Sequence, residues 1–555
     1  MATVTGLTAT HRGGQTFLVG TKNAGSNGST TYAIRRSSSA FTSSSDGTLI
    51  ATLDANSYRW LYSDAAYHNL TAGLIITDGG AALASTQILA VITTHSGETG
   101  TWHYAAFTSD DPTTVSAGVN TASVAETYQA VPGAIRVGTA TDGIHNTRYY
   151  MAWEDISTWN TTEWGYYGHL FSVNTPVSGI SPPYPMLLEL HSAGGTQYLE
   201  PIVSAQDAIQ GVTVNPVDMD WTGFTEPYTG SGMGNSRWTA RFHTANDLWM
   251  TCTEDRVIRY VKIVRDNATG DGFDFGIDSD RVYAMGGSLG SAAMHYVSHY
   301  PAVFAAGTTQ VGWFDATAYG TGSTKKVNAS DGLTLTQYLD MAYYAANSAL
   351  RPLSYAIGSY DGTVLPAPYT AGLAALETYH QPFFAEWQDV DHGGFSPVSY
   401  TQWDHHIAGS GHLRFDKSES TPAFGSASTS TTLPTFPGHF TGQRNGTIDW
   451  QSALHTITGG SAISDGASTF AISLISSSQS TGTTVTIRNA QTFLPVVGST
   501  IAYSTNNGQS GSGTLNADGS VTVPNLTIPT SAMRLTITAT PPVAHFASCF
   551  AGAIR

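Results

Sequence analysis

Three side chains of types that act together in hydrolysis follow one another along the chain. Ser288 lies in Gly286-Gly287-Ser288-Leu289-Gly290, Asp361 follows the apolar run LSYAIGS, and His392 follows the apolar run FFAEWQ. A histidine beside a serine hydroxyl removes its proton, and an aspartate behind the histidine orients the ring and stabilises its charged form. The order predicts nucleophilic attack on an acyl group, with Ser288 as nucleophile, His392 as base and Asp361 as orienting acid.

The glycines around Ser288 have a physical reason. A nucleophile at a sharp strand-to-helix turn has strained backbone angles, and side chains in place of Gly286 and Gly290 would collide with the strand and the helix. The strand-like run RVYAM precedes the motif and the helix-like run SAAMHYVSHY follows it. The N–H of Leu289, at the start of that helix, then faces a developing oxyanion. An ordinary tight turn around a serine is the alternative.

A second glycine-containing turn comes earlier, in the stretch LHSAGG after the run PMLLEL. Ser192 resembles a nucleophile there, but it lacks the leading glycine and precedes Ser288. We expect the loop from His191 to supply the other half of an oxyanion hole through the backbone N–H groups of Ser192 and Ala193. An ordinary turn between a strand and a helix is the alternative.

Four side chains near these motifs are candidates for substrate binding: His191, Trp221, Trp313 and Trp387. Tryptophan offers a flat face that suits sugars or aromatic acids. Packing in the core is an equally good explanation for each tryptophan.

Other acids could take the place of Asp361. Asp389 and Asp391 flank His392, but the preceding strand directs them differently from a residue in a separate loop, and Asp315 follows a strand that comes too early. No metal or organic cofactor is expected. The neighbouring His405 and His406, with His412, suggest a metal site only weakly, because adjacent histidines usually point apart. The acidic run DNATGDGFDFGIDSD does not have EF-hand spacing.

The elements that must position the three side chains alternate between strand-like and helix-like runs from about residue 134. EDRVIRYVKIVRD has apolar residues on one helical face, and FAAGTTQVGW, LSYAIGS and FFAEWQ are strand-like, with the helix-like runs LTQYLDMAYYAANSAL and AGLAALETYH between them. Such alternation predicts a largely parallel sheet with helices on both faces. Each interval between the three side chains admits a crossover, so all three can meet at the carboxyl edge of the sheet.

The regions on either side of this α/β part are rich in strands. Residues 1–133 contain about seven short strand-like runs separated by Gly, Ser, Asn and Asp, which predicts a β-sandwich. Residues 417–438 are rich in Ser, Thr and Pro and are expected to be a linker. Residues 439–555 again favour strands and hairpins, as in a small sandwich. The expected catalytic domain is therefore 134–416.

The motifs LLELHSAGG, GIDSDRVYAMGGSLGSAAM, AIGSYDG and WQDVDHGGF resemble the α/β-hydrolase superfamily over roughly residues 150–410. They are similar to the esterases grouped with feruloyl esterases, acetylxylan esterases and polyhydroxyalkanoate depolymerases. The prolyl-oligopeptidase branch shares the lead-in DSDRVY. Ser291, and Ser192 with Ala193, stand where many relatives carry glycine. The N-terminal region resembles a fibronectin type III domain. The resemblance implies a serine esterase acting on plant polysaccharide esters or polyesters. A serine peptidase and a binding protein with a degenerate core are the alternatives.

Composition and net charge limit the expected location and binding partners of the protein. Only 11% of residues are charged, against ~25% in an ordinary protein, which favours a secreted protein. The start MATVTGLTATHRGG has no basic head and no apolar signal core, so either the protein is intracellular or a signal peptide has been removed, and we expect the second. The net charge is −17, so nucleic acid and anionic membrane are not expected as partners. Cys252 and Cys549 form a disulfide or remain as two free thiols.

Overall fold

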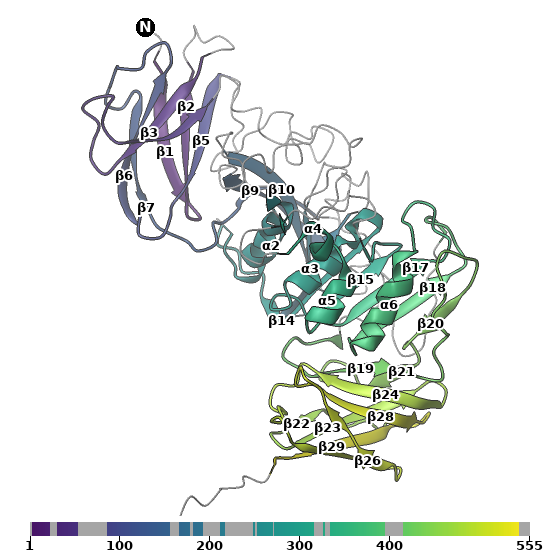
Figure 1. The fold of residues 1–555 in the computed structure, drawn as a ribbon. Coiled ribbons are helices and arrows are strands. Elements are labelled where there is room, and N and C mark those ends of the chain that lie inside the picture. Colours follow the sequence, from purple (N-terminus) through teal and green to yellow (C-terminus); the bar gives the residue numbers. More distant parts are fainter. Residues whose placement is uncertain are drawn as a thin grey trace, which may run out of the picture. The chain divides into compact units, whose positions relative to one another are not determined.

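The computed structural model describes residues 3–22, 30–53, 86–141, 143–155, 166–177, 181–191, 211–216, 248–249, 252–269, 271–315, 326–327, 333–394 and 414–542. The chain divides into two compact units. Figure 1 labels their helices and strands where there is room. The first contains Met1–Tyr296 and Ala316–Asp340, and the second contains Val297–Asp315 and Met341–Arg555. No helix in the described ranges is long and apolar enough to cross a membrane.

The first unit begins with a β-sandwich, of which the described residues contain seven strands. One sheet has the order β1-β2-β5 and the other the order β4-β3-β6-β7, and all their pairs are antiparallel. The strands are β1 (Thr5–Arg12), β2 (Gln15–Thr21), β3 (Tyr32–Ser37), β4 (Thr48–Leu53), β5 (Gln87–Thr93), β6 (Gly100–Thr108) and β7 (Thr121–Glu126). Buried positions alternate along β3, as expected for a strand with one face on a core. The predicted strand GLIITD lies outside the described residues.

The interior of this sandwich contains a charge pair. Arg36 Nη2 donates to Glu126 Oε2 at 2.6 Å, and the hydroxyls of Thr16 and Thr94 donate to the same carboxylate at 2.7 and 2.9 Å. Tyr104 also donates to Glu126, and burial, together with this bond, raises the pKa of Tyr104 well above its usual value. Because both carboxylate oxygens are hydrogen-bonded, the charge buried in the sandwich is compensated.

Ten strands of the described residues belong to one mixed sheet, called the central sheet below. Six lie in the first unit in the order β14-β11-β12-β10-β9-β8, and four in the second in the order β15-β17-β18-β20. β11 is parallel to β12 and β14, and β17 is parallel to β15 and β18. The strands are β8 (Ile135–Thr141), β9 (His145–Asp155), β10 (Tyr166–Pro176), β11 (Tyr184–Leu190), β12 (Val212–Pro216), β14 (Ile277–Gly287), β15 (Ala306–Gln310), β17 (Leu353–Gly358), β18 (Phe383–Gln388) and β20 (Gly442–Arg444).

Helices follow the strands as the alternation predicts. They are α2 (Cys252–Arg265), the 3₁₀ segment η3 (Ser288–Ala292), α3 (Ala293–His299), α4 (Leu335–Tyr338), α5 (Met341–Asn347) and α6 (Pro368–Thr378). A small two-stranded sheet joins β13 (Leu248–Trp249) and β16 (Lys326–Val327). In the second unit α6 packs closely on its sheet. A Cβ at Gly372 would lie 2.1 Å from the ring of Phe314, and the rings of Tyr369 and Tyr355 are 5.7 Å apart.

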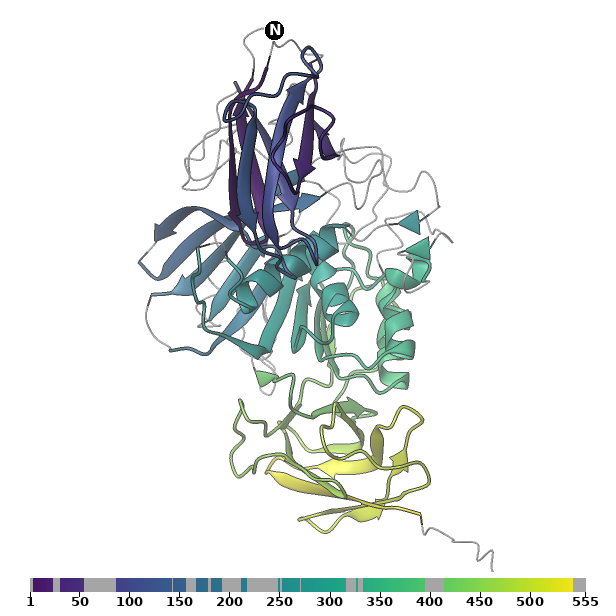
Figure 2. The ribbon, with the colours of Figure 1, turned by 90° about the vertical axis from the view of Figure 1, so that its left-hand side faces the viewer.

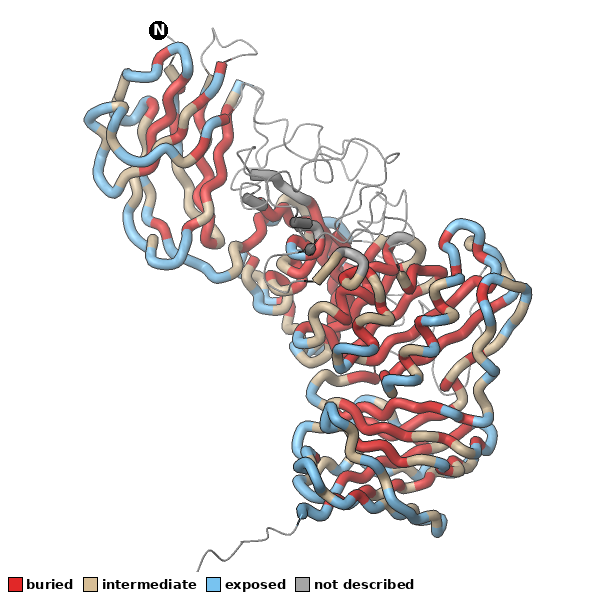
Figure 3. Tube along the Cα trace, in the orientation of Figure 1, coloured by how far each residue is buried: buried red, intermediate tan, exposed pale blue. Residues whose placement is uncertain are grey.

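The second unit ends in another β-sandwich. Its sheets have the orders β19-β24-β28-β27 and β21-β23-β29-β25-β26, with β22 paired to β23. The strands are β19 (Thr421–Gly425), β21 (Ile448–Trp450), β22 (Ser464–Asp465), β23 (Thr469–Ser476), β24 (Ser480–Arg488), β25 (Thr500–Thr505), β26 (Ser510–Ser512), β27 (Thr514–Leu515), β28 (Val521–Ile528) and β29 (Met533–Thr540). Figure 3 shows buried positions along the inner strands of this sandwich and exposed ones in its loops.

The segment expected as a linker, 417–438, contains one strand and packs on its surroundings. β19 lies within it and is buried along its length against β24, and Phe436 is buried against the rings of Tyr369 and Trp387. β20 follows and pairs with β18 of the central sheet rather than with the sandwich. The Ser, Thr and Pro content of the segment is typical of a linker. Its few apolar residues make the contacts that attach it to the fold.

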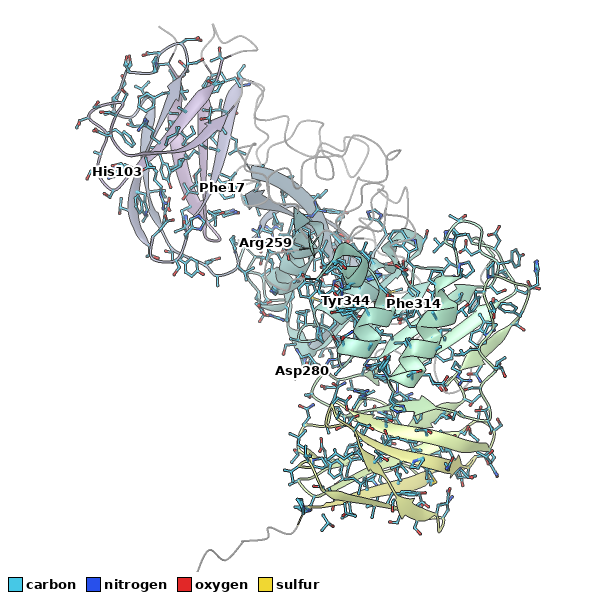
Figure 4. The ribbon with its side chains drawn as sticks, in the orientation of Figure 1. Phe17, His103, Arg259, Asp280, Phe314 and Tyr344 are labelled. Carbon is cyan, nitrogen blue, oxygen red and sulfur yellow. The ribbon has the colours of Figure 1, made fainter. Side chains whose placement is uncertain are left out.

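The N-terminal sandwich packs on the edge of the central sheet within the first unit. Phe17, Leu89 and Val91 form one apolar cluster with Ile135, Met151 and Trp153. The rings of Phe17 and Trp153 meet edge to face at 6.3 Å. Arg259 of α2 donates to the carbonyl oxygens of Trp153 and Pro132 at 2.8 Å each. Figure 4 labels Phe17 and Arg259, and Figure 2 shows the sandwich strands in the turned view.

Candidate active site

Ser288 lies at the turn between β14 and η3, as the motif predicts. Its φ angle is +54°, a left-handed conformation that costs a non-glycine residue about 1–3 kcal/mol. The preceding Gly287 is still extended, with φ −112° and ψ 152°, so the chain changes direction at the serine itself. Such a turn lifts the hydroxyl out of the strand and places it at the start of the following helical segment.

The two outer glycines of the motif allow the backbone segments to approach closely. A Cβ at Gly290 would lie 2.0 Å from the carbonyl oxygen of Leu190, and one at Gly286 would lie 2.1 Å from the carbonyl oxygen of Gly290. Leu190 is the last residue of β11 and is aligned with Gly286 of β14. The turn at Ser288 and the loop that begins at His191 are therefore adjacent within the first unit.

In the second unit, Asp361 and His392 are paired. His392 Nδ1 donates to Asp361 Oδ2 at 2.7 Å. The carboxylate is buried, with 2% of its side chain exposed, and its other oxygen accepts the N–H groups of Thr363 and Val364 at 2.8 Å each. Burial, and next the nearby charge of Asp361, raise the pKa of Tyr369 well above its usual value. A fully bonded carboxylate of this kind fixes the orientation of the imidazole and stabilises its protonated form.

The two rival aspartates beside the histidine have other partners. Asp391 Oδ1 accepts the backbone N–H groups of Gly362 and His392, both at 2.8 Å. These two bonds, the Gly362 one first, lower the pKa of Asp391 below its usual value. Asp389 Oδ1 accepts Nδ1–H of the exposed His439 at 2.7 Å. The acid that contacts the histidine ring is therefore the distant Asp361. No motif in the sequence indicates that Asp391 binds the loop after Asp361.

Two of the predicted substrate-binding tryptophans are buried. Trp313 and Trp387 have 3% and 1% of their surface exposed, and the Trp387 ring packs edge to face on Phe436 at 6.1 Å. Both have the surroundings of core residues, which agrees with the packing alternative. His191 is half-buried directly after β11. Trp221 lies outside the described residues.

Several other predicted residues also lie in parts of the chain that the structure does not describe. Ser192 and Ala193 of the expected oxyanion loop, the His405–His412 stretch and Cys549 lie outside the described residues. The described ranges contain no group of three or more His, Cys, Asp or Glu side chains placed to bind a metal.

Comparison with known proteins gives a family match over part of the chain. The model of the prolyl oligopeptidase family matches residues 273–407, which include the Ser288 turn, Asp361 and His392. No curated protein matches the chain. Among solved structures, an S-formylglutathione hydrolase from Agrobacterium tumefaciens is similar at 14% identity and a TM-score of 0.32, covering 46% of this chain and 92% of its own.

Two further solved structures are similar to the chain. An acetyl xylan esterase from Paenibacillus sp. R4 has 13% identity and a TM-score of 0.30, with 46% of this chain and 83% of its own covered. A putative dipeptidyl aminopeptidase IV from Bacteroides ovatus has 12% identity and a TM-score of 0.31, with 52% of this chain and 39% of its own covered. With the family match and the topology of the central sheet, the chain has an α/β-hydrolase core flanked by β-rich regions, as predicted.

Proposed function

We propose that the protein is a serine esterase that hydrolyses carboxylic esters through an acyl-enzyme. The proposal depends most on the 2.7 Å bond between His392 Nδ1 and the buried carboxylate of Asp361. In the proposed mechanism, Nε2 of the same ring accepts the proton of Ser288 Oγ. The left-handed backbone at Ser288, enclosed by two glycines, supports its role as the nucleophile.

In the proposed reaction, Ser288 Oγ attacks the ester carbonyl while His392 takes the hydroxyl proton. The tetrahedral oxyanion is bound by the N–H of Leu289 and by backbone N–H groups at Ser192 and Ala193. His392 then gives its proton to the leaving alcohol, and the acyl group remains on Ser288. A water, deprotonated by the same histidine, hydrolyses the acyl-enzyme and restores the serine.

We further propose that the substrate is polymeric, either a plant polysaccharide carrying feruloyl or acetyl esters or a polyester, and that the enzyme acts outside the cell. The low charged fraction of 11% and the two flanking β-sandwiches support this.

We also propose that the N-terminal sandwich is a fibronectin type III domain. The pairing of its fourth strand, β4, with β3 supports this assignment. In constant-type immunoglobulin domains the fourth strand joins the sheet of the first two.

The first test is the loss of turnover when Ser288 is changed. Ser288→Ala is expected to abolish hydrolysis of a p-nitrophenyl ester and labelling by a fluorophosphonate, with an unchanged circular dichroism spectrum. Asp361→Asn is expected to lower kcat by roughly 10³–10⁴, because the amide favours the wrong imidazole tautomer. Full turnover in Ser288→Ala would contradict the mechanism. A wild-type protein that neither turns over esters nor reacts with the probe would favour a non-catalytic binding protein.

A peptidase is the second candidate, because the matched family is named for an oligopeptidase. The same serine, histidine and aspartate would serve for a peptide amide. A panel containing acetylated xylan, methyl ferulate, a polyester film and a prolyl peptide amide separates the two. We expect kcat/KM for the esters to exceed that for the amide, and the reverse ranking would replace the esterase by a peptidase.

A further inference from the structure

A carboxylate beside the proposed base connects the two loops that carry the acid and the base. Asp391 Oδ1 accepts two backbone N–H groups, one from Gly362 and one from His392, each at 2.8 Å. Gly362 directly follows Asp361, and Asp391 directly precedes His392. One oxygen atom therefore links the residue after the acid to the base itself.

The backbone around this link is closely packed. A Cβ at Gly358, the last residue of β17, would lie 3.0 Å from the carbonyl oxygen of Val390. The N–H of Ser359 donates to the carbonyl oxygen of Gln388 at 2.8 Å. β17 and β18 therefore hold the first residues of the two loops together. Asp391 joins the same two loops beside the Asp361–His392 pair.

We propose that Asp391 is a positioning residue that fixes the separation between Asp361 and His392 by binding both of their loops. This inference rests on the proposed function, since it concerns the efficiency of the same acid and base. A side chain at this place must accept two hydrogen bonds, which a carboxylate or an amide oxygen can do and a methyl group cannot. The two bonds lower the pKa of the Asp391 carboxyl, which therefore stays charged at neutral pH.

The neighbouring Asp389 provides a matched control. It lies on the same loop, two residues before Asp391, but its carboxylate meets only the ring of His439 among the partners that the structure describes for it. Both side chains of that pair are largely exposed, 47% for Asp389 and 72% for His439, and such pairs contribute little. Removing Asp389 therefore removes a loop carboxylate without releasing the loop after Asp361.

The experiment compares Asp391→Ala, Asp391→Asn and Asp389→Ala with the wild type on one soluble p-nitrophenyl ester. Asp391→Ala is expected to lower kcat about tenfold with KM unchanged, because a small misplacement of a catalytic group affects the transition state more than binding. Asp391→Asn keeps the accepting oxygen and is expected to retain most of kcat. Asp389→Ala is expected to behave as the wild type.

A spectroscopic measurement separates positioning from general loop stability. The proton of His392 Nδ1, bonded to Asp361, is expected to give a downfield resonance that is broadened in Asp391→Ala and retained in Asp391→Asn. Unchanged kcat and resonance in Asp391→Ala would overturn the inference, and so would equal losses in Asp391→Ala and Asp389→Ala. An inactive wild type that also fails to react with a fluorophosphonate would instead refute the esterase, so the two failures are distinguishable.

Discussion

At the scale of single residues, the glycines around Ser288 are required by distances between backbone atoms. The carbonyl oxygen of Leu190 occupies the space where a Cβ at Gly290 would be, at 2.0 Å. Neither partner in that contact is a flexible side chain, so a substitution must move β11 or the turn. The glycine pattern, a weak signal in a chain with 58 glycines, thus has a structural cause here.

Gly290→Ala is expected to lower the free energy of unfolding by about 1–3 kcal/mol or more, because the methyl group overpacks the turn. Thermal unfolding followed by circular dichroism measures the loss. Gly393→Ala is the control, since a Cβ there has nothing within 4 Å. Equal melting temperatures for the two variants would show that the turn accommodates a side chain.

The charge of Asp391 gives a prediction for pH. Its folded pKa is depressed by the N–H groups of Gly362 and His392, so the stabilisation is complete above the ordinary value of 3.8 and is lost only as pH falls through the lower folded value. Asp391 therefore does not titrate between pH 5 and 9. The pH profile of kcat/KM should keep its shape in Asp391→Asn, and a displaced acid limb in that variant would contradict this assignment.

The sequence predicts the strand-to-helix turn at Ser288, and it predicts an acid and a histidine after successive strands. Distance along the sequence favours Asp389 and Asp391, so the prediction of Asp361 depended on its place after a separate strand. The choice is made by side-chain direction: Asp361 is buried and faces the ring, whereas Asp391 turns to backbone N–H groups. Trp387 is also close to the histidine in sequence, but its side chain is buried in the core.

At the scale of elements, the alternation of strands and helices was predicted well where each element has one apolar face. α2, β17, β18 and α6 lie where their runs predicted them. The long helix expected over LTQYLDMAYYAANSAL is instead two short helices, α4 and α5, separated at Leu339 and Asp340. The antiparallel strands β8, β9 and β10 were not foreseen, because their aromatic and polar residues do not form a simple apolar run.

The end of α6 gives a prediction at this scale. Arg488 of β24 donates to the carbonyl oxygens of Tyr379 and His380, and it also pairs with Asp518. Tyr379 is the C-cap of α6, so its carbonyl group has no partner within the helix, and His380 follows directly after it. Arg488→Ala is expected to lower the free energy of unfolding by about 1.5–3 kcal/mol and to speed amide exchange at the end of α6.

Arg534→Ala is the matched control for this change. Arg534 also donates to two carbonyl oxygens, those of Ser461 and Ala462, but all three residues belong to the C-terminal sandwich. Its removal should leave exchange in α6 unchanged. If both variants affected α6 equally, the contact made by Arg488 would have no special role there.

At the scale of the whole molecule, the N-terminal sandwich covers apolar surface of the central sheet. Trp153 and Met151 of β9 are buried against Phe17 and its neighbours. A chain that begins at residue 134 would expose these side chains to water. We expect it to bind a hydrophobic dye and to unfold at a lower temperature than the full chain.

A double-mutant cycle tests the same contact without deletion. Phe17→Ala and Trp153→Ala should show a coupling energy of about 0.5–1.5 kcal/mol, the usual range for an edge-to-face aromatic pair. Strictly additive losses in the cycle, or an unaltered melting temperature in the shortened chain, would mean that the sandwich does not stabilise the sheet.

The path of the chain between β18 and β21 limits how this protein can be rearranged. The chain enters the last sandwich at β19, returns to pair β20 with β18, and enters the sandwich again at β21. No single cut therefore releases that sandwich as an intact module. Exchange by recombination at one junction would leave β18 without β20 or the sandwich without β19, so β18 and the last sandwich are expected to be inherited as one piece.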